Sequence, residues 1–130
     1  MLFRSGVYLE GYGCVFTTRV NLAEGPGLNP FRPKLPETER AALRKKKLDR
    51  LPALRTAMRE MLINAAVVMD PVPAHEKMTL SVSLLHMPHE DVSGLPTQIV
   101  MQAERQTLAA FLQKGVDKAA QEAAIQVREY

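Results

Sequence analysis

The sequence predicts an α+β domain with the element order strand, helix, strand, strand, helix, strand. Residues 6–22 alternate as in a long strand, and residues 51–68 carry an apolar stripe at helical spacing. Two short alternating runs, 78–84 and 99–103, flank a segment with glycine and proline, which is typical of a hairpin. A chain of 130 residues that is 46% hydrophobic matches one domain with one core, so we take residues 1–130 as a single domain.

The first predicted strand, residues 6–22, is rich in valine, tyrosine, phenylalanine and threonine, which favour a half-buried sheet. Its even positions form the more apolar face, and we expect it to lie in the middle of the sheet. Gly11 and Gly13 lack the third glycine and the following helix of a phosphate-binding loop, and indicate instead a bulge or a close approach of another backbone. Cys14, the only cysteine, is expected to be a buried small hydrophobe.

The same strand carries a family resemblance. The segment Tyr8-Leu9-Glu10-Gly11-Tyr12-Gly13, followed by Val15-Phe16, resembles a segment of exported bacterial proteins of unknown function. The resemblance extends over most of the chain through Leu108, Phe111, Lys114-Gly115 and the closing Val127-Arg128-Glu129-Tyr130. It implies no activity. Because the members have a longer N-terminal part, the resemblance implies either that this chain is a fragment of a longer protein or that its reading frame starts too late. It further implies export if an upstream signal segment precedes the chain; as written, the chain is expected to be soluble.

A long helix is predicted after a proline-rich connection. Residues 24–36 contain four prolines and two glycines and are expected to form an exposed crossover. Thr38 is predicted to cap the helix, and Pro52 to kink or restart it. From Leu51 onward, apolar residues recur at spacings of three and four, and Leu62 widens this stripe, which predicts a strongly amphipathic helix: Leu51, Leu54, Met58, Met61, Ala65 and Val68.

The second half of the chain completes the predicted topology. After the hairpin, Leu108 and Phe111 indicate a short helix that ends at Gly115, residues 117–123 restart it, and residues 125–127 form the last strand. The order βαββαβ with a long Pro-rich first crossover predicts a ferredoxin-like two-layer sandwich, with both helices on one face. The first strand would then lie between the third and the last. The predicted core contains Phe16, Leu54, Met58, Met61, Leu80, Val82, Ile99, Met101, Phe111 and Val127.

One loop combines side chains that bind metals. His86, His89, Glu90 and Asp91 supply two imidazoles and two carboxylates that could surround Zn²⁺ or a similar ion. We favour the alternative, a solvated polar loop, because spacing alone is a weak signal for a metal site. No cofactor is expected from any other pattern in the chain.

The charge pattern gives little support for nucleic-acid or membrane partners. The net charge of +3 is small, and the basic run Arg44-Lys45-Lys46-Lys47 is typical of a solvated helix face. The predicted open sheet face has no aromatic side chains on which bases could stack. We therefore expect no specific nucleic-acid binding, and no apolar run reaches the length of a membrane span.

The leading functional hypothesis is a non-enzymatic interaction domain that self-associates as a dimer or docks a protein partner. It rests on the sheet face turned away from the helices, which carries apolar as well as polar side chains and would therefore expose an apolar patch to water. The apolar residues assigned to this face are Val7, Leu9, Val15, Leu85, Met87 and Val100. The alternative is a metal-binding module or metal-dependent enzyme that uses the loop of His86, His89, Glu90 and Asp91. No hydrolase turn is present, and the sequence does not decide whether the chain is an enzyme.

Overall fold

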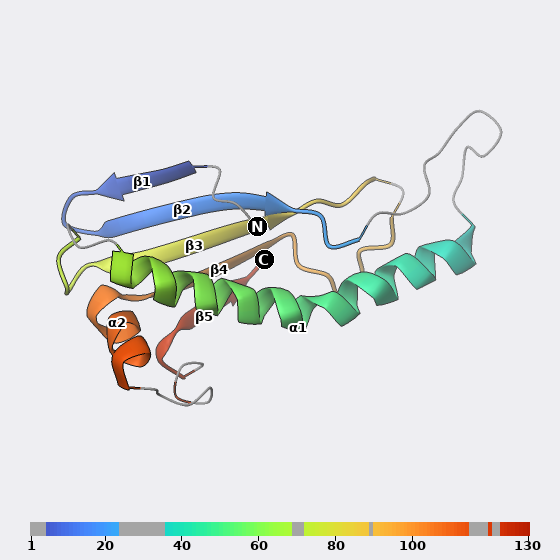
Figure 1. Ribbon diagram of the computed structural model, residues 1–130. Helices are drawn as coiled ribbons and strands as arrows, with labels where there is room; N and C mark the ends of the chain where they lie inside the picture. Colours follow the sequence, from blue (N-terminus) through green and yellow to red (C-terminus); the bar gives the residue numbers. More distant parts are fainter. Residues whose placement is uncertain (1–4, 24–35, 69–71, 89, 115–119, 121–122) are drawn as a thin grey trace.

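The chain folds into a five-stranded mixed sheet with two helices (Figure 1). The structure, a computed structural model, describes residues 5–23, 36–68, 72–88, 90–114, 120 and 123–130. Its elements are β1 (Ser5–Leu9), β2 (Gly13–Val20), α1 (Glu37–Val68), β3 (Lys77–Leu84), β4 (Gln98–Glu104), α2 (Arg105–Lys114) and β5 (Gln126–Glu129). The α+β class is confirmed. The predicted crossover, the cap at Gly115 and most of residues 117–123 lie outside the described residues.

The predicted ferredoxin-like strand order is wrong. The strands follow the chain in the order β1-β2-β3-β4-β5, so β2 lies between β1 and β3 instead of between the third and last predicted strands. The β2–β3 pair is parallel, and the other three pairs are antiparallel. Because β5 runs antiparallel beside β4, the segment with α2 connects two neighbouring strands and does not cross the sheet.

A turn divides the long strand that the sequence predicts into β1 and β2. The Tyr12 amide donates to the Leu9 carbonyl at 3.0 Å, and Gly11 has φ 81°, as the third residue of a type II turn requires. Gly13 has φ 139°, and a Cβ there would lie 1.8 Å from the Lys77 carbonyl oxygen. The predicted close approach of another backbone is thus confirmed at Gly13, whereas Gly11 serves the turn.

Helix α1 is continuous through Pro52, which the sequence predicts to kink or restart it. Pro52 is exposed, and its missing N–H costs one backbone bond while Leu51 and Leu54 pack beside it. The helix begins at Glu37, and the Arg40 amide donates to the Pro36 carbonyl at 3.0 Å, so Thr38 lies inside the first turn and is not the cap.

The apolar stripe of α1 also differs from the prediction after Met58. The buried stripe continues through Leu62, which the sequence predicts to widen it, and through Ala66, which lies outside the prediction, because a helix has 3.6 residues per turn. Met61 and Ala65 are only partly buried, and Val68 is exposed.

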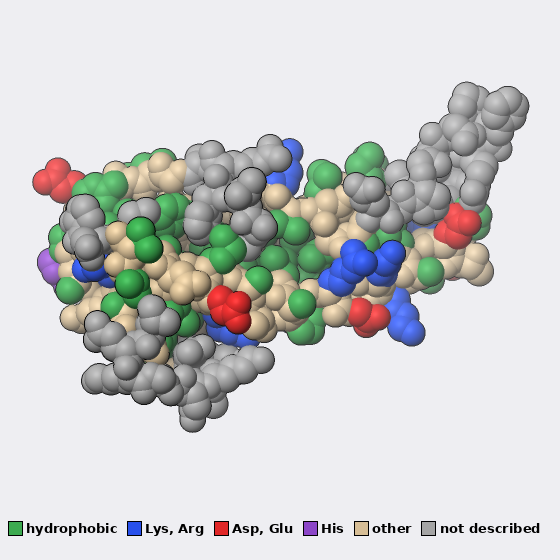
Figure 2. All heavy atoms as spheres, in the orientation of Figure 1, with side chains coloured by type: hydrophobic (Ala, Val, Ile, Leu, Met, Phe, Trp, Pro, Cys, Tyr) green, Lys and Arg blue, Asp and Glu red, His purple; other side chains and the backbone are tan. Residues whose placement is uncertain are grey.

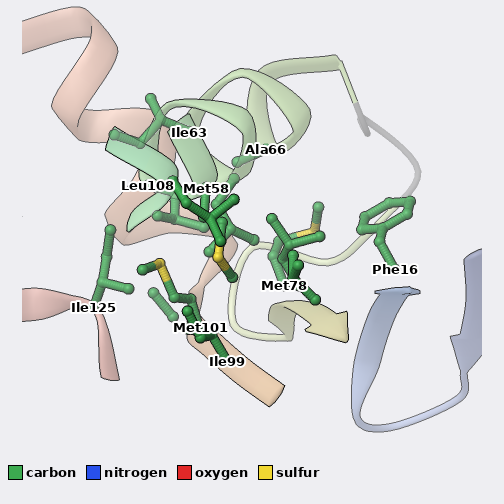
Figure 3. Close-up of a cluster of buried hydrophobic side chains, with 14 of the residues drawn as sticks. Phe16, Met58, Ile63, Ala66, Met78, Ile99, Met101, Leu108 and Ile125 are labelled. Atoms are coloured by element: carbon green, nitrogen blue, oxygen red, sulfur yellow. The ribbon is translucent and has the colours of Figure 1, made fainter. Parts of the chain in front are cut away.

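One face of the sheet forms the core with both helices. Figure 3 shows Met58 and Leu108, from the helices, beside Met78, Ile99 and Met101 from the strands. Eight of the ten predicted core residues lie in this cluster: Phe16, Leu54, Met58, Leu80, Val82, Ile99, Met101 and Phe111. Val127 is 41% exposed because β5 is an edge strand, so its predicted place in the core is wrong.

Candidate functional site

The loop between β3 and β4 packs against the N-terminal half of α1. This half of the helix extends past the ends of the strands, and the loop runs alongside it (Figure 1). The Arg44 Nε donates to the Ser93 carbonyl at 2.5 Å, and Lys47 makes three polar contacts with the same loop. The loop that carries the predicted metal ligands is therefore held by basic residues of the helix.

Lys47 is the most deeply buried charged side chain among the described residues, at 1% exposure. Its Nζ lies 2.7 Å from Glu90 Oε1, 3.1 Å from the Leu85 carbonyl oxygen and 3.1 Å from His86 Nδ1. Three acceptors match the three N–H donors of an ammonium group. A buried charge needs this degree of pairing.

The contacts of His86 determine which ring nitrogen carries the proton. Nε2 lies 3.0 Å from the Pro96 carbonyl oxygen, which can only accept, so Nε2–H is the donor. Nδ1 of the neutral ring is then the acceptor for Lys47. Both ring nitrogens are used within the protein, and His86 joins the helix to the two ends of the loop.

Both carboxylates of the loop are stabilised in their charged form. Burial alone would raise the pKa of Glu90, but hydrogen bonds from Lys47 and from the Met87 amide, together with the charge of Lys47, hold its pKa below the ordinary value. The pKa of Asp91 is also lowered, because the hydroxyl and the amide of Ser93 both donate to Oδ1.

These contacts engage three of the four predicted metal ligands, His86, Glu90 and Asp91. Among the residues that the structure describes, no group of three or more His, Cys, Asp or Glu side chains is arranged to hold a metal ion. His86 and Glu90 meet at Lys47, while Asp91 turns to Ser93. His89 lies outside the described residues, so the metal site stays a prediction, which metal analysis of untagged protein would test.

We expect the free energy of unfolding to fall as Glu90 takes up a proton. Its folded pKa lies below the ordinary 4.5, so its contribution is complete above about pH 4.5 and is lost as the pH falls through the folded value. Urea unfolding from about pH 7 to about pH 3 should therefore show the parent and Glu90→Gln converging in stability. The exposed control Glu60→Gln should stay parallel to the parent; a constant gap for Glu90→Gln would contradict the assignment.

The sequence predicts that the basic run Arg44 to Lys47 forms a solvated helix face, but only part of the run is exposed to solvent. Lys and Arg side chains gather over the N-terminal half of α1 (Figure 2), and Lys45 and Lys46 are exposed. Lys47 is buried, and Arg44 contacts the loop. Neither helix of the described chain has the length and apolar character to cross a membrane.

The open sheet face has a polar centre and an apolar margin. In the centre, the Tyr12 hydroxyl lies 3.4 Å from Thr79 Oγ1 and accepts from Gln102 Nε2 at 2.7 Å, and Gln98 donates to Ser81 at 2.7 Å. At the margin, the strand register sets Val7 beside Val15, with Leu9 on the same face. The apolar character is thus greatest next to β1.

The six predicted interface residues divide into two groups. Val7, Leu9, Val15 and Val100 lie on the open face by register, the first two exposed and the others half-buried. Leu85 and Met87 are exposed but follow the end of β3, in the loop.

A buried carboxylate fixes the hairpin of β1 and β2. Glu76, 5% exposed, accepts hydrogen bonds from the Tyr8 hydroxyl at 2.8 Å and from the Gly11 amide at 3.2 Å. The bond to Glu76 raises the pKa of Tyr8, which keeps the phenol protonated as a donor. Burial raises the pKa of the neighbouring Cys14 thiol, which is buried as predicted.

Comparison with protein-family models, with curated proteins and with solved structures finds no match. The function is therefore inferred from the contacts of the loop, of the open sheet face and of the β1–β2 hairpin. Sequence reasoning missed Lys47, although a signal was present: it lies midway between Leu43 and Leu51, at a spacing of four on the buried stripe.

Proposed function

We propose that the domain is an interaction module that acts by self-association rather than by catalysis. The observation that carries the proposal is the exposure of Val7 and Leu9, 54% and 47%, beside the half-buried Val15 on the open sheet face. Contiguous apolar side chains of this kind usually mark an interface. The buried charged cluster of Lys47, by contrast, is fully paired and holds a loop in place.

A second copy of the chain is the partner that this surface fits. The apolar residues are flanked by neutral polar groups of β3 and β4 that are already hydrogen-bonded to one another. The charged side chains that the register places on this face lie on β2 to β5: Arg19, Lys77, Glu104 and Arg128. Strand β1 carries no charge, so the patch around Val7 and Leu9 can meet a second copy without repulsion. A closed two-fold dimer would bring the same patch of both chains together.

Sedimentation of the isolated chain tests the proposal. We expect a dimer at tens of micromolar, which Leu9→Asp weakens because it places a charge in the apolar patch. Val100→Asp reports whether the contact extends across the sheet to β4. Val68→Asp, an exposed apolar position at the end of α1, is the control and should leave the dimer intact. A monomer at these concentrations that responds to neither Leu9→Asp nor Val100→Asp would contradict the proposal.

A further inference from the structure

Strand β1 is an unprotected sheet edge. It is the outermost strand, and no described element lies on its outer side (Figure 1). Val7, Tyr8 and Leu9 are consecutive and are exposed by 54%, 49% and 47%. Because successive side chains of a strand point to opposite faces, their exposure shows that neither face of β1 is covered. The place of β1 at the end of the strand order leaves its outward N–H and C=O groups without a partner strand among the described residues.

The opposite edge is protected in the ways that sheet edges usually are. Strand β5 is four residues long and carries Arg128 and Glu129, and Glu129 forms an ion pair of 2.6 Å with Arg55 of α1. Charges and short length discourage pairing with another chain. Strand β1 has neither charge nor proline in Ser5–Leu9, so among the described strands it is the edge that is open to pairing.

Strand β1 is also held in place before any partner arrives. Five residue pairs join it to β2, and Glu76 binds both the Tyr8 hydroxyl and the Gly11 amide at the tip of the hairpin. A strand that is already ordered loses little conformational entropy when it pairs.

We propose that two copies of the chain pair through β1, antiparallel about a two-fold axis at Val7, and so join their sheets into one. This inference rests on the proposed self-association and specifies its contact. In this proposed pairing, Val7 lies opposite Val7 of the second copy. Gly6 of each copy lies opposite Tyr8 of the other, so the smallest residue of the strand faces the largest. Because β1 is uncharged, a second copy meets no like charge across the axis. The two pairs of Val7 and Val15 then form one apolar strip across the join.

Charge substitution at Val7 tests the pairing. Directly opposed residues of antiparallel strands lie about 4.5 to 5.5 Å apart, so Val7→Lys and Val7→Glu should each reduce dimerisation at least about tenfold in Kd by self-repulsion. An equimolar mixture of the two variants should restore a heterodimer. Val100→Asp, on distant β4, should leave the dimer intact.

The outcomes separate the contact from the self-association itself. If the parent chain dimerises but both Val7 variants do so equally well, or if Val100→Asp abolishes the dimer, edge pairing is overturned while self-association stands. If the parent chain is a monomer, both proposals fail. Circular dichroism and thermal melting of each variant test whether the fold is retained. If Val7→Lys and Val7→Glu are both folded and monomeric, and their equimolar mixture also stays monomeric, edge pairing is overturned.

Discussion

Replacing Gly13 with alanine is expected to lower the free energy of unfolding by about 5 kcal/mol, enough to abolish most of the stability of a small domain. Two effects add at this position. The φ of 139° is a conformation that L-residues rarely adopt, and the new Cβ would lie 1.8 Å from the Lys77 carbonyl oxygen and 2.7 Å from its nitrogen. The obstacle is backbone on a paired strand, so β2 and β3 must separate to relieve it.

Gly11→Ala is the matched control for Gly13→Ala. Gly11 also has a positive φ, 81°, but its added Cβ meets no atom within 4 Å. Only the conformational cost remains, about 1 kcal/mol. Urea unfolding of the two variants measures the difference, and similar losses for both would show that the contact with Lys77 is not what requires glycine.

Lys47→Met is expected to destabilise the domain by about 4 kcal/mol, because it leaves the Glu90 carboxylate with its side chain 5% exposed and without its cation. Methionine retains most of the apolar stem, so the loss comes from the ammonium group and its contacts to Leu85 and His86. The control Lys46→Met, at the exposed neighbouring position, should change the free energy of unfolding by no more than about 0.5 kcal/mol.

The double variant Lys47→Met with Glu90→Gln identifies the source of that loss. Removing the remaining charge should recover part of the stability, because an uncharged amide is less costly to bury than a lone carboxylate. Chemical denaturation of the parent, the two single variants and the double variant gives the coupling between the two positions. Additive losses would show that Lys47 and Glu90 do not act as a pair.

The sequence predicted most elements because their periodicity is local. The strands β3 and β4 and the apolar second half of α1 follow from alternation and helical spacing alone. The turn at Gly11 was missed because the alternation in residues 6–22 shows no break at the turn. The turn that separates β1 from β2 depends on positive φ angles at Gly11 and Gly13, which the alternation pattern does not reveal. The strand order was missed because alternation shows which face is buried but does not identify a strand's neighbours.

The sequence identified part of the candidate site but not the residue at its centre. His86 and Glu90 stood out as ligand types, but ligand types in a loop do not reveal which distant side chain they meet. Their partner Lys47 lies on α1 within a basic run, and composition alone favoured a solvated position. Its spacing of four from Leu43 and Leu51 was the stronger signal, since a helix buries a stripe whatever the charge of the residue within it.

The strand order also has a consequence for how the chain folds. The antiparallel pairs β1–β2, β3–β4 and β4–β5 are separated by 3, 13 and 21 residues, whereas 56 residues separate β2 from β3, so the three antiparallel closures cost less chain entropy. Only the parallel β2–β3 pair spans the whole of α1, and its closure costs the most chain entropy. We expect the hairpins to form early and the docking of β2 on β3 to come after the rate-limiting step. Changes at that seam should then act mainly by accelerating unfolding and should leave the folding rate nearly constant.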